Sequence, residues 1–139
     1  MKTFLKIFAS VLLIFNGAGA VYGGWNLIVH PDGSSIDLSI SLLKNTPFED
    51  YFVPGIILFV LNGLCSFFVL GVLLLRVEKY SWFIIAQGVI LTGWIGIQMM
   101  MIRMIYFLQI ILGSTGLFLI LTGLLLTFID VPELKKGKR

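Results

Sequence analysis

The chain is poor in charged residues. Ten Lys and Arg and seven Asp and Glu make up 12% of its 139 residues, about half of the ~25% that is usual in soluble domains. The hydrophobic share is 58%, and the mean hydropathy is +1.03. This composition excludes a soluble globular domain, and it excludes intrinsic disorder, which requires low hydrophobicity. The net charge of +3 is too small and too scattered to predict nucleic-acid binding.

Cysteine and histidine are also scarce. Cys65 is the only cysteine, which excludes an intramolecular disulfide, and His30 is the only histidine. A metal site needs three or four ligands at suitable spacing, and no cluster of His, Cys and carboxylates has that spacing. No phosphate-binding loop, dinucleotide-binding glycine pattern or hydrolase motif is present. We therefore expect a protein that is not an enzyme and that uses neither a metal nor a cofactor.

Long apolar runs are abundant instead. A helix needs ~20 apolar residues to cross the hydrocarbon core of a bilayer, and four stretches have that length: 4–22, 54–75, 82–102 and 105–129. The connections between the last three are short, so these spans should be antiparallel neighbours. The prediction is a single membrane domain over residues 1–139. Its fold class is an all-α, four-transmembrane-helix, up-and-down bundle.

The basic residues predict the orientation of this bundle. With four spans, only Lys44 and Arg103 fall on the outer side. Eight fall on the other: Lys2, Lys6, Arg76, Lys79, Lys135, Lys136, Lys138 and Arg139. The positive-inside rule then places both termini in the cytoplasm, where the basic tail at 130–139 meets the anionic lipids of the inner leaflet.

The first apolar run has a second interpretation. Lys2 and Lys6 precede it, and Ala18-Gly19-Ala20 resembles the cleavage site of a signal peptide. Because the apolar run continues past this site to Trp25, we expect the segment to be retained. Cleavage would leave three spans with the N-terminus outside.

One segment, 23–53, is long enough to fold outside the bilayer. Residues 26–29 and 36–40 flank His30-Pro31-Asp32-Gly33, which has the residue types of a type I turn, so a short hairpin is predicted. Thr46-Pro47-Phe48-Glu49 has the pattern of a capping box with proline at the first helical position, which predicts a short interfacial helix. We favour a lid over the outer end of the bundle as the role of this loop, and a binding element is the alternative.

Polar residues inside the spans are the candidate site. By span direction, five lie in the outer half and form a candidate outer polar pocket or one interhelical network: Asn16, Asn62, Gln98, Arg103 and Gln109. Gln87 lies towards the cytoplasm. Intramembrane polar groups are expensive and are therefore functional candidates.

Arg103 stands at the turn between the third and fourth spans, with no carboxylate near it in sequence. Glu49 and Asp50 are candidate loop anchors for its guanidinium, and Asp32 and Asp37 are further possible partners. The alternative is a side chain that snorkels to the lipid head groups.

Small residues form stripes at helical spacing. In the fourth span the stripe consists of Gln109, Gly113, Gly116, Ile120, Gly123 and Thr127. In the third span it consists of Gly88, Thr92 and Gly96. Such stripes let helix backbones approach closely. They predict packing within the chain or, alternatively, an interface between copies.

The stretch TPFEDYFVPGIILFVLNG at 46–63, with the pattern PGxxLFxxNG, is followed by GWIGIQ at 93–98, with the pattern GWIxIQ. These stretches resemble a family of small, uncharacterised four-span bacterial membrane proteins. The resemblance implies the bacterial inner membrane and carries no activity. We expect a non-enzymatic accessory, assembly or lipid-interacting subunit, whose partners are membrane lipids, another membrane protein or a second copy. The alternative is a small homo-oligomeric transporter or channel with an outward-facing polar pocket.

Overall fold

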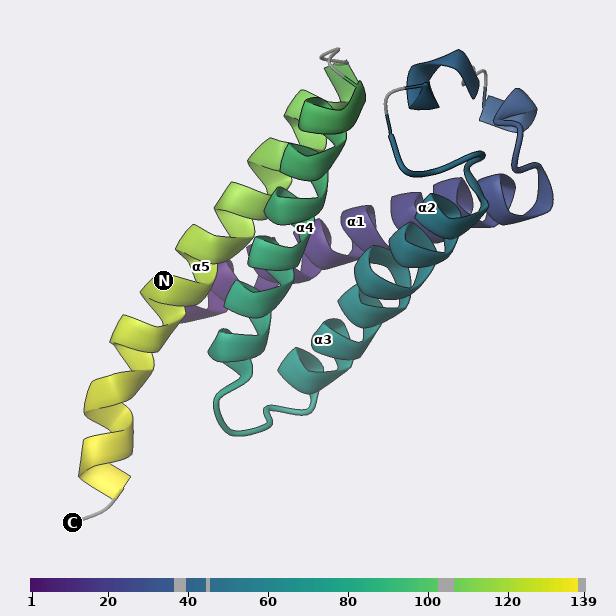
Figure 1. Ribbon diagram of the computed structural model, residues 1–139. Helices are drawn as coiled ribbons and strands as arrows, with labels where there is room; N and C mark the ends of the chain where they lie inside the picture. The colour runs from purple at the N-terminus through teal and green to yellow at the C-terminus, as the bar shows by residue number, and fades with distance from the viewer. Residues whose placement is uncertain (37–39, 45, 103–106, 138–139) are drawn as a thin grey trace.

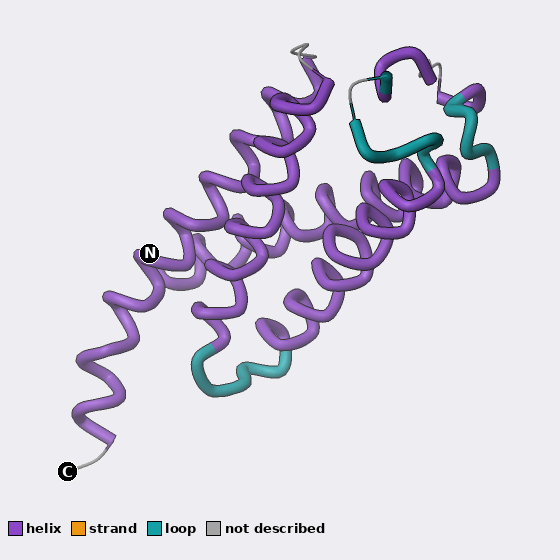
Figure 2. The backbone as a smooth tube through the Cα atoms, viewed as in Figure 1, coloured by secondary structure: helices purple, strands orange, loops and turns teal. Residues whose placement is uncertain are grey.

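Four long helical spans make up most of the molecule. The computed structural model describes residues 1–36, 40–44, 46–102 and 107–137, and the regular structure in this part is entirely helical (Figure 2). The spans are, in chain order, α1 (Lys2–Val29), the composite of α2 (Phe52–Ile57), the π-helix η3 (Leu58–Leu64) and α3 (Cys65–Leu74), then α4 (Tyr80–Ile102) and α5 (Phe107–Gly137). By length and composition all four could cross a membrane, which confirms the prediction of four long apolar helices. With 28 and 31 residues, α1 and α5 are longer than expected.

The four spans follow one another as antiparallel neighbours (Figure 1). α1 contacts the α2–η3–α3 span, α3 contacts α4, α4 packs along α5, and α5 contacts α1, so the spans form a closed ring. α1 crosses obliquely behind α4 and α5, and its N-terminus lies beside α5 (Figure 1). The α2–η3–α3 span and α4 meet at their connecting turn and diverge towards the opposite end. This divergence matters for the site described below.

The main apolar core lies at the end of the bundle near the α3–α4 turn. All four spans contribute buried side chains to it: Leu5, Ala9, Leu13, Val69, Val72, Leu73, Tyr80, Ile84, Leu119 and Leu126. A smaller cluster of Leu27, Leu43 and Tyr51 lies under the long loop at the other end. The loop therefore covers the ends of α1 and α2, as a lid would.

The predicted glycine stripes on α4 and α5 meet each other. A Cβ atom added at Gly88 would lie 2.7 Å from the Gly116 carbonyl oxygen. One added at Gly116 would lie 3.0 Å from the Thr92 backbone nitrogen. One added at Gly123 would lie 3.0 Å from the Ser81 carbonyl oxygen. Side chains at these positions would push the two backbones apart, which confirms close packing within the chain as one use of the stripes.

The stripes are not in tight contact near the end of α4 and the start of α5. An added Cβ at Gly113 would make only an ordinary contact, 3.6 Å from Ile95 Cγ2, and one at Gly96 would meet no atom of the described residues within 4 Å. Gly96 is therefore free of the α4–α5 contact that its spacing predicted.

The long loop differs from the predicted hairpin. Residues 26–29 form the last turn of α1, where the His30 N–H donates to the Asn26 carbonyl. The loop continues as two 3₁₀ turns, η1 (Ser34–Ile36) and η2 (Ile40–Leu43). Residues 26–29 are helical because the helix lets Leu27 pack in the cluster under the loop. An isolated hairpin would have little to pack against. The Asp32 carboxylate accepts hydrogen bonds from the backbone N–H and from the hydroxyl of Ser34. These two bonds, the backbone one first, lower the pKa of the Asp32 carboxyl.

The predicted helix at Thr46 is also wrong. Thr46 Oγ1 donates to the Leu43 carbonyl and accepts the Phe48 N–H, so this side chain closes a turn rather than capping a helix. The helix begins instead at Phe52, whose N–H donates to Asp50 Oδ1 at 3.0 Å. Pro54 is tolerated in its first turn because no intrahelical N–H is needed there.

Candidate functional site

The structure separates the predicted outer polar residues into two groups. Asn16 and Asn62 meet near the middle of their spans. Gln98 and Gln109 form a second pair nearer the loop end, with Gln109 Nε2 donating to Gln98 Oε1 at 3.4 Å. Arg103 lies outside the described residues, so its place in the pocket stays a prediction.

The two candidate loop anchors have other local surroundings. Asp50 accepts the Phe52 N–H at the start of α2, and Glu49 is exposed beside a shallow hollow of the loop. Asp37, a further possible partner of Arg103, also lies outside the described part of the chain. The proposed ion pair with Arg103 therefore stays a prediction too.

The group near mid-span is a buried amide cluster. Asn16 Nδ2 donates to Ser66 Oγ at 2.7 Å and to the Asn62 carbonyl at 3.3 Å, and all three residues are at most 1% exposed. Gln87 joins it from α4, with Nε2 donating to the Leu61 carbonyl at 3.1 Å. Ser66 was not singled out as a site residue, although it shares a helical face with Asn62 in the sequence.

The cluster surrounds the π-helix η3. The widened turn is marked by the Cys65 N–H, which bonds to the Val60 carbonyl five residues back. Two successive carbonyls of this segment, those of Leu61 and Asn62, accept amide N–H groups from α4 and α1 respectively. In hydrocarbon an irregular backbone persists only where protein groups satisfy it. Gln87 and Asn16 therefore stabilise the irregular segment from both sides.

Asn62 takes part through its backbone and not through its side chain. The residue is fully buried, and neither Oδ1 nor Nδ2 has a hydrogen-bond partner among the described residues. Burial of an unpaired amide costs ~1–3 kcal/mol. The sequence thus identified a position in the cluster but not the atoms that connect it.

The Asn16–Ser66 bond is expected to couple α1 to α3 weakly. We expect a double-mutant cycle of Asn16→Ala and Ser66→Ala in nanodiscs to give a coupling free energy of about 0.6 kcal/mol, with ~1.7 as an upper bound. Thr115, whose hydroxyl bonds to Ile111 within α5, provides the control, because Asn16→Ala and Thr115→Ala should be additive. Equal coupling in both cycles would contradict a direct bond.

An apolar groove opens where α4 diverges from α2 and η3. Its volume is about 550 Å³, and its walls come from the loop, α2, η3 and α4: Leu43, Pro47, Phe48, Tyr51, Pro54, Ile57, Leu61, Val89, Ile90, Gly93, Trp94, Ile97 and Gln98. The groove is open along its side, since Leu61, Val89 and Ile97 are each more than 40% exposed. Loop residues Leu43, Pro47, Phe48 and Tyr51 complete its walls.

This groove was not predicted, although Trp94 and Gln98 share a helical stripe in the sequence. Four separate segments build it, and no spacing within one helix reveals that two helices diverge. Of the predicted site residues that the structure describes, Gln98 alone lines it. The favoured role of the loop, a lid, and the alternative, a binding element, are both compatible with its position here.

In the described part of the chain, no three His, Cys, Asp or Glu side chains lie close enough to share a metal ion. The site is a lateral groove with apolar walls, next to a buried polar cluster. No protein-family model, curated protein or solved structure matches this chain.

Proposed function

We propose that this chain is a small, non-enzymatic integral membrane protein that holds an acyl chain of a membrane lipid in its apolar groove. The observation that carries the proposal is the groove of about 550 Å³ between α2–η3 and α4, with an open side and with loop residues in its walls. This is the lipid-interacting form of an accessory subunit. Binding of a partner membrane protein or of a second copy would be an additional property, separate from lipid binding.

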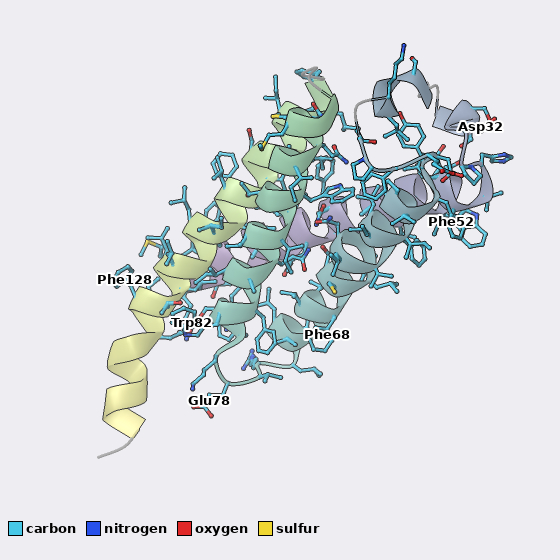
Figure 3. All side chains as sticks on the ribbon, viewed as in Figure 1. Asp32, Phe52, Phe68, Glu78, Trp82 and Phe128 are labelled. Atoms are coloured by element: carbon cyan, nitrogen blue, oxygen red, sulfur yellow. The ribbon has the colours of Figure 1, made fainter. Side chains whose placement is uncertain are left out.

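Membrane insertion is supported by the outer surface of the bundle. Large apolar side chains project from it, among them Phe68 and Phe128 (Figure 3), which are 61% and 74% exposed. Monomeric proteins in water rarely expose so many large apolar side chains. In a membrane these side chains contact lipid hydrocarbon, so their exposure carries no unfavourable hydration free energy.

The orientation follows from the basic residues. Lys2, Lys6, Arg76 and Lys79 line one hollow at the end of the bundle opposite the long loop. By the positive-inside rule this end and both termini face the cytoplasm. The groove then opens in the outer leaflet of what we take to be a bacterial inner membrane.

An acyl chain is the occupant that fits the position and chemistry of the groove. Ligand pockets typically have volumes of ~300–1,000 Å³ and mainly apolar walls, and this groove meets both conditions. Its open side lies between spanning helices, so the phase it opens to is hydrocarbon. The loop residues Leu43, Phe48 and Tyr51 add further apolar surface to its walls.

The buried amides support lipid holding over the alternative of a homo-oligomeric transporter or channel. Asn16 and Asn62 are at most 1% exposed, and the first donates within the protein. Neither lines the groove. A solute pathway would need such groups to face an aqueous space.

Filling the groove should abolish the retention of lipid. Gly93 lines the groove, and an added Cβ there meets nothing within 4 Å, so Gly93→Leu fills space without a clash. We expect native mass spectrometry of the delipidated protein, titrated with phosphatidylcholine, to show one retained lipid in the wild type and at least tenfold weaker retention in Gly93→Leu.

Gly96→Leu is the matched control. It lies one turn along the same helix, also with nothing within 4 Å, and it does not line the groove. Its lipid retention should equal that of the wild type. Equal retention by all three proteins would contradict the assignment of the groove to lipid.

A further inference from the structure

A second hollow lies at the other end of the bundle, among basic residues. Its volume is about 420 Å³, and its charged walls come from α1, the α3–α4 turn and α5: Lys2, Lys6, Arg76, Glu78, Lys79 and Asp130. Four cations therefore face two carboxylates. The site keeps an excess of positive charge after internal pairing.

The cations differ in what they already contact. Lys2 Nζ forms an ion pair with Asp130 Oδ1 at 2.8 Å, and Lys6 Nζ lies 5.0 Å from the centre of the Tyr80 ring. Arg76 and Lys79 are exposed, and in the described part of the chain neither has a carboxylate at ion-pair distance. These two are therefore the cations available to an external anion.

The backbone brings these two cations to the hollow. Arg76 and Lys79 have φ angles of 54° and 64°, the left-handed conformation that residues other than glycine seldom adopt. The tight turn that results holds both side chains at the rim. Ser81 and Thr127 add hydroxyl groups to the walls, with their oxygens 3.0 Å apart.

The position of the hollow indicates the source of the anion. Trp82 lines it and is 57% exposed, and it lies at the same end of the bundle as Glu78, opposite Asp32 and the long loop (Figure 3). Tryptophan is typical of the membrane–water interface. A basic hollow between spanning helices at that depth has the chemistry of a site for lipid phosphate.

We propose that Arg76 and Lys79 bind the phosphate of an anionic phospholipid head group at the cytoplasmic end of the bundle. The proposal rests on the membrane insertion proposed above, but it is independent of the apolar groove. Arg76 is suited to two phosphate oxygens through its planar guanidinium. Lys79 supplies a second positive charge in the wall of the same hollow.

The test measures head-group selectivity in the full-length protein. Native mass spectrometry in detergent gives affinities for dioctanoyl phosphatidylglycerol and dioctanoyl phosphatidylcholine, which differ only in head group. We expect the wild type to prefer phosphatidylglycerol. The double variant Arg76→Gln, Lys79→Gln should weaken phosphatidylglycerol binding about thirtyfold, the factor expected when two cations that attract an anionic lipid are lost.

The matched control removes one cation from the opposite end of the bundle. Lys44 is exposed and lines a different hollow in the long loop, and Lys44→Gln changes the net charge by the same amount as Arg76→Gln alone. Arg76→Gln should weaken the preference for phosphatidylglycerol, whereas Lys44→Gln should leave it nearly intact. An equal loss in both single variants would show general electrostatic attraction and would overturn the site.

Two further arms separate the other outcomes. Inorganic phosphate or glycerol 3-phosphate that competes as strongly as the lipid would assign the hollow to a soluble phosphate and overturn the lipid proposal. Gly93→Leu should keep the preference for phosphatidylglycerol even though it loses the groove lipid. The two proposals can therefore fail separately.

Discussion

Replacing Gly116 by leucine is expected to separate α4 from α5 and to destabilise the protein by about 3 kcal/mol or more. An added Cβ at Gly116 already lies 3.0 Å from the Thr92 nitrogen and 3.1 Å from the Gly88 oxygen. Both are backbone atoms, which cannot rotate away as a side chain can. Forcing extra atoms into a packed contact typically costs ~1–3 kcal/mol and occasionally more. Unfolding in nanodiscs, followed by circular dichroism, measures the loss.

Gly96→Leu is again the matched control. The same side chain is added on the neighbouring helix, at a position with open space around it. Its stability should stay within about 0.5 kcal/mol of the wild type, as for most surface substitutions. If both variants lose equal stability, the cost comes from leucine in a glycine-rich helix and the close contact is not the cause.

Removing α1 up to Ala20 is expected to prevent folding of the rest. A chain beginning at Val21 loses Leu5, Ala9 and Leu13 from the main core and the Asn16 amide from the buried cluster. Single large-to-small changes at such positions cost ~2–5 kcal/mol each. The total is comparable with the ~5–15 kcal/mol of a whole domain. Size-exclusion chromatography in detergent should show aggregation in place of a single peak.

The same burial predicts that α1 is retained and not cleaved as a signal peptide. The intact mass of protein purified from a bacterial host should include the residues before Val21. Ala18→Leu blocks an A-x-A cleavage site at an exposed position, and it should leave the mass unchanged apart from the substitution. The prediction would be contradicted if the wild-type mass corresponded to a chain without its first twenty residues and the Ala18→Leu mass to the full-length chain.

The apolar runs predicted the four spans well because length and composition alone control whether a segment can be a spanning helix. The small-residue spacing on α5 predicted Gly116 and Gly123 at a close contact for a similar reason. Helical periodicity is a local property, and it reports which residues share a face. It does not report how far along that face the partner helix stays in contact, which is why Gly96 was misplaced.

The loop was predicted less well because its local signals compete with contacts from elsewhere. Turn residues at 30–33 favoured a hairpin, but packing of Leu27 against Leu43 and Tyr51 favours a longer α1. The capping-box pattern at Thr46 was present, yet its hydroxyl bonds to Leu43 and Phe48 in a turn. The same side-chain chemistry suits a cap or a turn, and tertiary contacts choose between them.

The helical class, the four long apolar helices and the basic end of the molecule can be predicted from the amino-acid sequence, since each depends on composition or on spacing within one segment. Packing between the helices, in contrast, makes α4 diverge from α2 and η3, which opens the apolar groove. It also makes Arg76 and Lys79 meet α1 and α5 around a second hollow. Both sites are assembled from segments far apart in the chain, and their geometry depends on helix crossing angles. Those angles arise from packing between helices, which no pattern within a single helix encodes.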